Sequence, residues 1–320
     1  MTEQLVLDEL AVGEETNGFP LSSHVLMLHD RHRCRTFGRA ISATVKPGDT
    51  VVDVGTGTGI LALLAARQGA KRVLAVDNSP SLRVAQDVVR HNGLESTIKC
   101  RDLDACEDPL PRIRADVIIC ELLGCFGIDE GITTVAARWC KSILKKTGVF
   151  IPNNCTLYVA PVECREVSDS LRFWSRRRYG IDFSPFLESA YNCVYHMPEV
   201  PFRFLAEPAT LTHMDFHTLK SPRIRASAEQ TINESGTMHG YIGWFSSDLC
   251  DGIKITNDPH EPETHWHPVF MPVKPVRVSP GASTTFDFRY APPGTMTWKG
   301  CIESSRGRRL RDFAHSGYDI

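Results

Sequence analysis

The sequence has no marked excess of charge of either sign. Its 36 lysines and arginines nearly balance 38 aspartates and glutamates, which gives a formal net charge of −2. A protein that grips phosphates needs a basic surface, so this balance argues against a nucleic-acid partner. No apolar run approaches the roughly 18 residues of a membrane span, and the segment MTEQLVLDEL lacks the pattern of a secretory signal. We expect a cytoplasmic protein without membrane association.

The eleven cysteines form no CxxC pair. Several of them, such as Cys120 and Cys155, fall inside apolar stretches, where a free thiol behaves as a small hydrophobic side chain. The spacing is therefore typical of a reduced protein with buried thiols, and it favours neither a disulfide scaffold nor a metal site.

Short apolar runs alternate with helical patterns through the first half of the chain. This alternation predicts an α/β fold with a parallel, doubly wound sheet. From Val200 onward, proline, threonine and valine become more frequent, and short strand patterns such as HGYIGWF and TTFDFRY follow one another. The change of texture predicts two domains, at residues 1–151 and 152–320. The expected strands of the first cover 50–54, 72–76, 97–99, 115–120 and 148–151, and its helices cover 60–68, 80–91 and 132–144.

A glycine-rich turn follows the first expected strand in the segment DVGTGTG. Gly55, Gly57 and Gly59 let the backbone approach a ligand closely, and the helix that follows offers free N–H groups. Asp53, next to the last residue of that strand, is a candidate for the same site. The GxGxG spacing differs from the GxGxxG of dinucleotide sites, so it favours S-adenosyl-L-methionine over a nicotinamide cofactor.

Two further acids follow the next expected strands. Asp77 lies 24 residues after Asp53, where a carboxylate is placed to hold the two hydroxyls of a ribose. Capping of the helix that follows is the alternative role for Asp77. Asp102, in CRDLDA, is a candidate for the exocyclic amine of adenine.

Glu121 and Glu130 lie nine residues apart in ELLGCFGIDE, directly after the buried strand at 115–120. Two carboxylates beside a nucleotide-type site suit arginine, because its planar guanidinium stays protonated and pairs with carboxylates in a bidentate way. A solvated acidic loop is the alternative. Enzymes that methylate base amines usually carry Asn/Asp-Pro-Pro-aromatic at this position, so its absence argues against a nucleic-acid base as acceptor.

Several separated motifs, in the same order, resemble those of the protein arginine methyltransferase family. VVDVGTGTGILALLAA is similar to the cofactor motif of the family, and ELLGCFGIDE to its double-glutamate loop. ETHWHPVFMPV carries its Thr-His-Trp loop, IPNNCTLYVAPVE resembles its strand pair entering the barrel, and MLHDRHRCRTF resembles its cofactor-capping helix. The resemblance covers roughly residues 22–318.

The resemblance implies a Rossmann-like class I methyltransferase domain with a capping segment at residues 1–45. A β-barrel domain would follow, with a helical arm at about 168–215 that mediates a head-to-tail homodimer. The implied donor is S-adenosyl-L-methionine, with S-adenosyl-L-homocysteine as product. The implied site residues are Glu121 and Glu130 on the substrate guanidinium, Asp30 and His265 as a dyad near the target nitrogen, Arg33 on the methionine carboxylate, Trp266 and Met27 at the substrate pocket, and His24 and Met27 at the cofactor.

The sequence departs from the family pattern at one helix. The Tyr-Phe-x-x-Tyr pattern that closes over cofactor and substrate is replaced by GFPLSSHVLML, in which Phe19 is the remaining aromatic residue. Features of several branches coexist, so the number of methyl groups added stays open.

The sequence indicates the methyl acceptor less directly than it indicates the reaction. With no added docking domain and little net negative charge, we favour free L-arginine or a small guanidine over a protein arginine. Three other readings remain: a non-catalytic scaffold partner, an NAD(P)-dependent oxidoreductase, and a methyltransferase of another amine.

Overall fold

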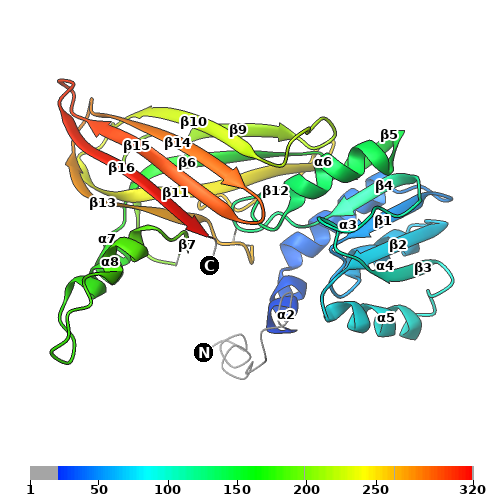
Figure 1. The fold of residues 1–320 in the computed structure, drawn as a ribbon. Coiled ribbons are helices and arrows are strands. Elements are labelled where there is room, and N and C mark those ends of the chain that lie inside the picture. The colour runs from blue at the N-terminus through cyan, green and yellow to red at the C-terminus, as the bar shows by residue number, and fades with distance from the viewer. Residues whose placement is uncertain (1–20, 198, 263, 319–320) are drawn as a thin grey trace.

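A five-stranded parallel sheet organises the first half of the chain in the computed structural model, which describes residues 21–197, 199–262 and 264–318 (Figure 1). The strand order is β3-β2-β1-β4-β5, and every neighbouring pair is parallel. The expected α/β class is therefore confirmed. The strands are β1 Thr50–Val54, β2 Arg72–Asp77, β3 Ile98–Asp102, β4 Ala115–Cys120 and β5 Leu144–Ile151, and the helices are α2 Leu21–His29, α3 Arg31–Thr44, α4 Ile60–Arg67, α5 Ser81–His91 and α6 Ile132–Ser142.

The strand order reverses direction at β1, which pairs with β2 on one side and β4 on the other. Val54 and Cys120 are register partners at the carboxyl ends of β1 and β4. The loops that follow these two strands therefore leave the sheet side by side, at the switch point where open α/β sheets bind ligands. This topology brings the glycine-rich turn next to the two-glutamate loop.

The second half of the chain forms two antiparallel sheets, and the apolar interior between them is continuous with the core of the first half. One has the order β7-β13-β11-β6-β8, with β9 on β6 and β12 on β11, and the other has the order β10-β14-β15-β16. Large aromatic side chains such as Tyr241, Phe286 and Trp298 fill the space inside, fully buried. These strands are β6 Asn154–Glu163, β7 Tyr195–His196, β8 Arg203–Phe204, β9 Ala209–Asp215, β10 Ile224–Thr231, β11 Gly236–Cys250, β12 Ile253–Thr256, β13 Val269–Val278, β14 Ser283–Ala291, β15 Thr295–Glu303 and β16 Arg309–Tyr318.

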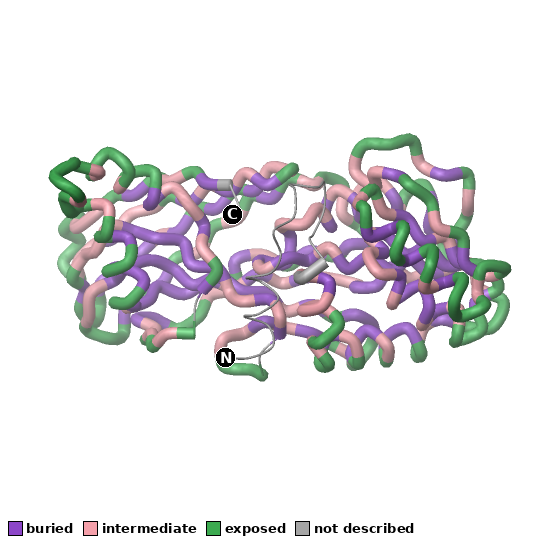
Figure 2. Tube along the Cα trace, turned by 90° about the horizontal axis from the view of Figure 1, so that it is seen from below, coloured by how far each residue is buried: buried purple, intermediate pink, exposed green. Residues whose placement is uncertain are grey.

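The two sheets approximate the expected β-barrel. Among the described residues, no ladder of backbone hydrogen bonds joins one sheet to the other, so the barrel is not closed by strand pairing. Figure 2 shows buried backbone along the strands of both halves and exposed backbone at the loops.

A helical projection leaves the β region after β6 (Figure 1). It contains α7 Arg165–Leu171, a 3-10 turn at Arg172–Ser175 and α8 Phe186–Tyr191. The arm was expected at about 168–215, but β8 and β9 both pair with β6. Residues 209–215 thus belong to the sheet as β9, and the Leu211 and Met214 side chains of this strand are buried.

The helices and the cysteines of the described residues can be compared with what the sequence predicts. None of its helices is long and apolar enough to cross a membrane. All eleven cysteines are free thiols, and Cys120 and Cys155 are fully buried. The first 20 residues of the expected capping segment, with Phe19, lie outside the described residues.

Candidate active site

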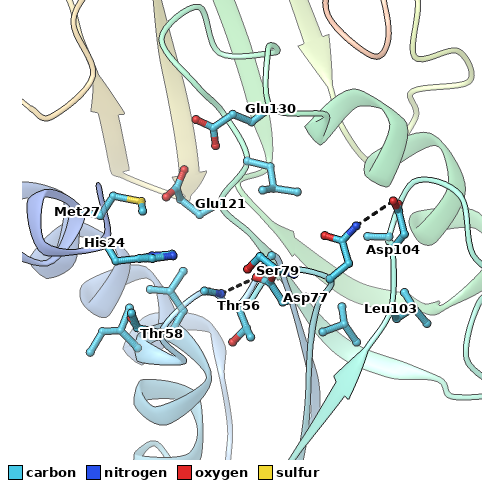
Figure 3. Close-up of a pocket in the computed structure, with 18 of the residues that line it drawn as sticks. His24, Met27, Thr56, Thr58, Asp77, Ser79, Leu103, Asp104, Glu121 and Glu130 are labelled. Carbon is cyan, nitrogen blue, oxygen red and sulfur yellow. Dashed lines mark hydrogen bonds between the residues drawn. The ribbon is translucent and has the colours of Figure 1, made fainter. Parts of the chain in front are cut away.

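A cavity of about 480 Å³ opens at the carboxyl ends of the parallel strands (Figure 3). Glu121 and Glu130 line one end, and Leu103 and Asp104 line the other. In Figure 3 the two glutamate carboxylates turn toward one another. The remaining lining includes His24, Met27, Arg33, Gly55, Thr56, Gly57, Asp77, Asn78 and Ser79. Most residues that the sequence singled out therefore meet in one cavity.

The glycine-rich turn forms the floor of this cavity. Gly55 and Gly57 line it with positive φ angles of 71° and 51°, which favour glycine. A Cβ on Gly57 would lie 3.1 Å from the His24 ring, so a larger residue would crowd the cavity wall. Gly59 also has a positive φ, of 86°, but it is the N-cap residue of α4 and lies close to Ala85. It is not among the described residues that line the cavity.

Asp53 supports the turn from behind instead of facing the cavity. Its carboxylate accepts hydrogen bonds from Thr56 Oγ1 at 2.6 Å and from the Ala62 N–H at 3.0 Å. The Asp53 side chain is fully buried, and Asp53 is not among the described residues that line the cavity. A direct contact of Asp53 with a cofactor was expected, and the structure instead gives this residue a supporting position. Burial raises the pKa of Asp53 to about 7, against the opposing effect of the Thr56 and Ala62 hydrogen bonds.

Asp77 lines the cavity and is held by two backbone donors. Gly57 N–H and Ser79 N–H each lie 2.8 Å from its carboxylate oxygens. The alternative role as a helix cap is not realised, because α5 begins at Ser81 with Pro80 as its N-cap residue. Asp77 therefore joins the glycine turn to the second strand at the centre of the cavity.

The adenine-side candidate, Asp102, lies two residues before Asp104, an acid that lines the cavity. Asp102 is exposed and lies outside the described lining, whereas Leu103 and Asp104 line the cavity. Asn78 Nδ2 donates to Asp104 at 3.0 Å across this end. The sequence pattern ended the third strand at Lys99, but β3 continues to Asp102, so the chain turns into the cavity only after that residue.

The two-glutamate loop is shaped by Asp129, which the sequence did not single out. Its carboxylate accepts hydrogen bonds from the backbone N–H groups of Cys125 and Phe126, both at 2.8 Å. Gly124 has a φ of 66°, and a Cβ there would lie 2.4 Å from Asp129 Oδ2. A glycine is therefore required for the loop to fold around this carboxylate.

A second unforeseen residue, Asn257, ties the loop to the β region. Its Nδ2 donates to the Cys125 carbonyl at 2.7 Å, and its Oδ1 accepts from the Phe245 N–H at 2.9 Å. Asn257 is buried, so both hydrogen bonds are shielded from water. The side chain belongs to the segment after β12, far away in the sequence.

Arg33 lies in the cavity wall, where it forms a buried ion pair with Glu121. Its Nε donates to Glu121 Oε2 at 2.8 Å, and its Nη2 donates to the same oxygen. Burial opposes the charge, but the Glu121 carboxylate raises the pKa of Arg33 above its ordinary value. One of the two acids expected to bind an acceptor guanidinium is thus bound to a guanidinium of the chain itself.

Asp30 and His265 are brought together behind this ion pair. Asp30 Oδ2 accepts from the His265 N–H at 2.8 Å and lies 3.0 Å from His265 Nδ1. Burial opposes ionisation of Asp30, but the hydrogen bonds from His265 and Arg33 outweigh it and lower the pKa of that carboxyl. Neither member of the expected dyad is among the described lining residues of the cavity.

Trp266 is buried next to the Arg33 guanidinium, whose Cζ lies 5.8 Å from the ring centroid. Trp266 lines a separate groove together with residues such as Phe202 and Pro268, so the structure does not place it in the wall of the main cavity. Met27 and His24, both on α2, do line that cavity. Burial lowers the pKa of His24 and thereby favours its neutral form.

Family models match both halves of the chain. Residues 153–296 match the arginine methyltransferase oligomerization subdomain, and residues 38–151 match the ribosomal protein L11 methyltransferase model.

Three curated relatives cover most of the chain. A probable protein arginine N-methyltransferase 6 of Arabidopsis thaliana is 34% identical over 71% of this chain. An arginine N(omega)-methyltransferase of Streptomyces achromogenes is 28% identical over 81%, and protein arginine N-methyltransferase 6 of Xenopus laevis is 26% identical over 85%. The chain spans 54% of the Arabidopsis relative, 73% of the Streptomyces relative and 84% of the Xenopus relative.

Solved structures show the same fold. The Trypanosoma brucei PRMT1 enzyme-prozyme complex with AdoHcy aligns with a TM-score of 0.79 at 22% identity, over 93% of this chain and 98% of that chain. Arabidopsis thaliana protein arginine methyltransferase 10 aligns with a TM-score of 0.74 at 23% identity, over 94% and 98%.

Proposed function

Because this chain belongs to the protein arginine N-methyltransferase family, we propose that it methylates a guanidino nitrogen of arginine with S-adenosyl-L-methionine as donor. The products would be Nω-methylarginine and S-adenosyl-L-homocysteine. One observation carries the proposal. The glycine-rich turn and both carboxylates, Glu121 and Glu130, line a single cavity. A methyl donor bound at the turn and a guanidinium bound by the two glutamates would therefore be in contact.

The residues around the turn fit the donor. Asp77 is placed for ribose hydroxyls, and the positively charged Arg33 is placed for a methionine carboxylate in the same cavity. Burial lowers the pKa of His24, which favours its neutral form beside the sulfonium. The donor, when bound, supplies a methyl group on a positively charged sulfur, and the chain must orient a nitrogen toward it.

Glu121 and Glu130 would perform that orientation. A guanidinium is a weak nucleophile because its lone pairs are delocalised. Carboxylates that accept its N–H groups draw positive charge toward the bound nitrogens, so a terminal nitrogen becomes more reactive. Holding that nitrogen about 3 to 3.5 Å from the methyl carbon supplies the positional part of the rate gain. The proton released would leave through Glu130 or the His265–Asp30 pair.

We favour free L-arginine or a small guanidine as the acceptor. The Streptomyces relative named arginine N(omega)-methyltransferase matches 81% of this chain and 73% of its own length, which supports this choice. A protein or peptide arginine is the alternative, supported by the relatives named protein arginine N-methyltransferase. The chain keeps both acids and the glycine turn, which disfavours a non-catalytic scaffold.

The assembly belongs to the same proposal. A head-to-tail homodimer would form through the helical projection, whose Tyr179, Ile181 and Phe186 side chains are largely exposed. We propose a cytoplasmic location, because the cysteine pattern is typical of a reduced protein.

The decisive experiment uses a donor labelled on its methyl group. The full chain is incubated in parallel with L-arginine, an arginine-rich peptide and a histone-like protein, and products are identified by mass spectrometry. Label on a guanidino nitrogen supports the reaction, and the labelled acceptor identifies the substrate. Binding of S-adenosyl-L-homocysteine without transfer to any guanidine would support the scaffold reading instead.

A further inference from the structure

The Arg33–Glu121 ion pair uses only half of the glutamate carboxylate. Both donating nitrogens of Arg33, Nε and Nη2, point to Oε2. Oε1 is buried and has no hydrogen-bond partner within the described part of the chain. Leaving a buried charged oxygen unsatisfied costs free energy, so Oε1 is a vacant acceptor on a residue that lines the cavity.

Arg33 is fixed in place on several sides. The side chains of Arg33 and Glu121 are only 7% and 4% exposed. Arg33 Nη1 donates to the Met27 carbonyl at 3.3 Å, and the guanidinium lies 5.8 Å from the Trp266 ring and 6.0 Å from the Phe37 ring. Contacts of a cation with two aromatic rings add to its retention. A donor carboxylate must therefore come to Arg33, which stays beside Glu121.

We propose that Arg33 is a positioning residue that makes acceptor binding depend on the donor carboxylate, an inference that rests on the proposed function. Without a donor, Glu121 is the anion that pairs with the Arg33 guanidinium, which weakens the attraction of Glu121 for a second guanidinium. A donor carboxylate gives Arg33 a second anion, so Arg33 neutralises less of the Glu121 charge. Glu121 then attracts the acceptor guanidinium more strongly. The vacant Oε1 then accepts an N–H of the acceptor guanidinium.

The surrounding charges make this coupling local. Asp30 accepts the backbone N–H of Arg33, and its own charge is engaged by His265. Glu130 lines the same cavity from the end of its loop, nine residues after Glu121. Interactions between such shielded charges are strong, because little water separates them. A coupling of about 1 to 3 kcal/mol, or roughly 5- to 150-fold in affinity, is the usual range between two sites.

Two donor-site ligands that differ in the carboxylate test the proposal. S-adenosyl-L-homocysteine has the amino-acid carboxylate, and 5′-methylthioadenosine lacks the whole amino-acid part. Calorimetry would measure the affinity for whichever of L-arginine and the arginine-rich peptide is the acceptor, with each ligand at saturation. We expect at least fivefold tighter acceptor binding with S-adenosyl-L-homocysteine. Equal affinity with the two ligands would overturn the proposal while leaving the proposed function intact.

Matched variants separate Arg33 from general effects of the amino-acid part. Arg33→Lys keeps the charge but loses the fork that reaches two partners at once. Arg35→Lys, on the same helix and exposed, is the control. The difference between the two ligands should fall below twofold in Arg33→Lys and persist in Arg35→Lys. Full persistence in Arg33→Lys would overturn the proposal, and failure of S-adenosyl-L-homocysteine to bind the wild-type protein would overturn the proposed function as well.

Discussion

Asp30 and His265 are 235 residues apart in the chain, yet one carboxylate oxygen of Asp30 receives both the backbone N–H and the Nδ1 edge of His265. The other oxygen caps α3 by accepting the Arg33 N–H at 2.8 Å. A single acid thus fixes the start of the helix that carries Arg33 and the loop that carries Trp266.

Removing this carboxylate should cost stability and activity together. Asp30→Ala loses an N-cap hydrogen bond, which is worth about 0.5 to 2 kcal/mol, and releases His265. We expect a lower melting temperature and a lower kcat. His265→Ala is the control because it leaves the cap intact, so it should melt closer to wild type. A melting temperature of Asp30→Ala equal to that of wild type would contradict the role of this carboxylate.

Neutralising either glutamate should slow methyl transfer. Glu130→Gln removes a charge from the acceptor end of the cavity, and we expect kcat to fall about 100-fold or more, in line with other electrostatic catalytic groups. Glu121→Gln should fall at least as far, because Arg33 also loses its anion. Glu107→Gln, which also removes a charge from the lining of the cavity, should change kcat by less than threefold. Steady-state kinetics would check this, and a Glu130→Gln enzyme with wild-type kcat would remove that residue from the mechanism.

Asp53 should make the stability of the protein depend on pH near neutrality. Its pKa in the folded chain is about 7, whereas an aspartate in an unfolded chain has a pKa near about 3.9. Between these values the folded state retains a proton that the unfolded state has lost. The free energy of unfolding contributed by this group therefore falls as pH rises from about 4 to about 7.

Asp53→Asn should abolish that fall. The amide oxygen can accept both hydrogen bonds that Oδ2 now accepts from Thr56 and Ala62, and it does not titrate. Melting temperatures between pH 5 and 8 would show a flatter profile than wild type. Asp87→Asn, an exposed change on α5, should leave the slope unchanged. Parallel profiles for wild type and Asp53→Asn would show that Asp53 is ionised throughout this range.

Charges on the helical projection should prevent self-association. Ile181 and Phe186 are 57% and 55% exposed, which is unusual for large apolar side chains without a partner surface. In the double variant Ile181→Asp, Phe186→Asp we expect at least a tenfold weaker dimer by light scattering after size exclusion. Asp182→Asn, exposed on the same segment, is the control. An unchanged dimer would place the interface elsewhere.

The sequence predicted the parts of the site that follow from strand ends. Glu121 follows a strand whose apolar run is unmistakable, and the glycine turn follows another, so both were expected at one edge of the sheet. Both line the cavity. Asp102 was expected at the same edge but is not among the lining residues, because a half-exposed strand such as β3 has a weak pattern and its end was placed three residues too early.

Other parts depend on contacts that no local pattern contains. Asp53 has the spacing of a ligand-binding acid, but only the fold shows that it is buried behind the turn. Asp129 and Asn257 act through hydrogen bonds to loop backbone, and such roles leave no spacing signature. The pairing of Arg33 with Glu121 joins two residues that the sequence assigned to different ligands.

The bridge formed by Asn257 has a consequence for engineering. Because this amide holds both the Cys125 carbonyl and the Phe245 N–H, the geometry of the acidic loop is inherited partly from the C-terminal half. A chimera that grafts residues 1–151 onto the barrel of a relative would retain the donor crevice. It would orient its acids correctly only if the foreign barrel presented an equivalent amide at that place.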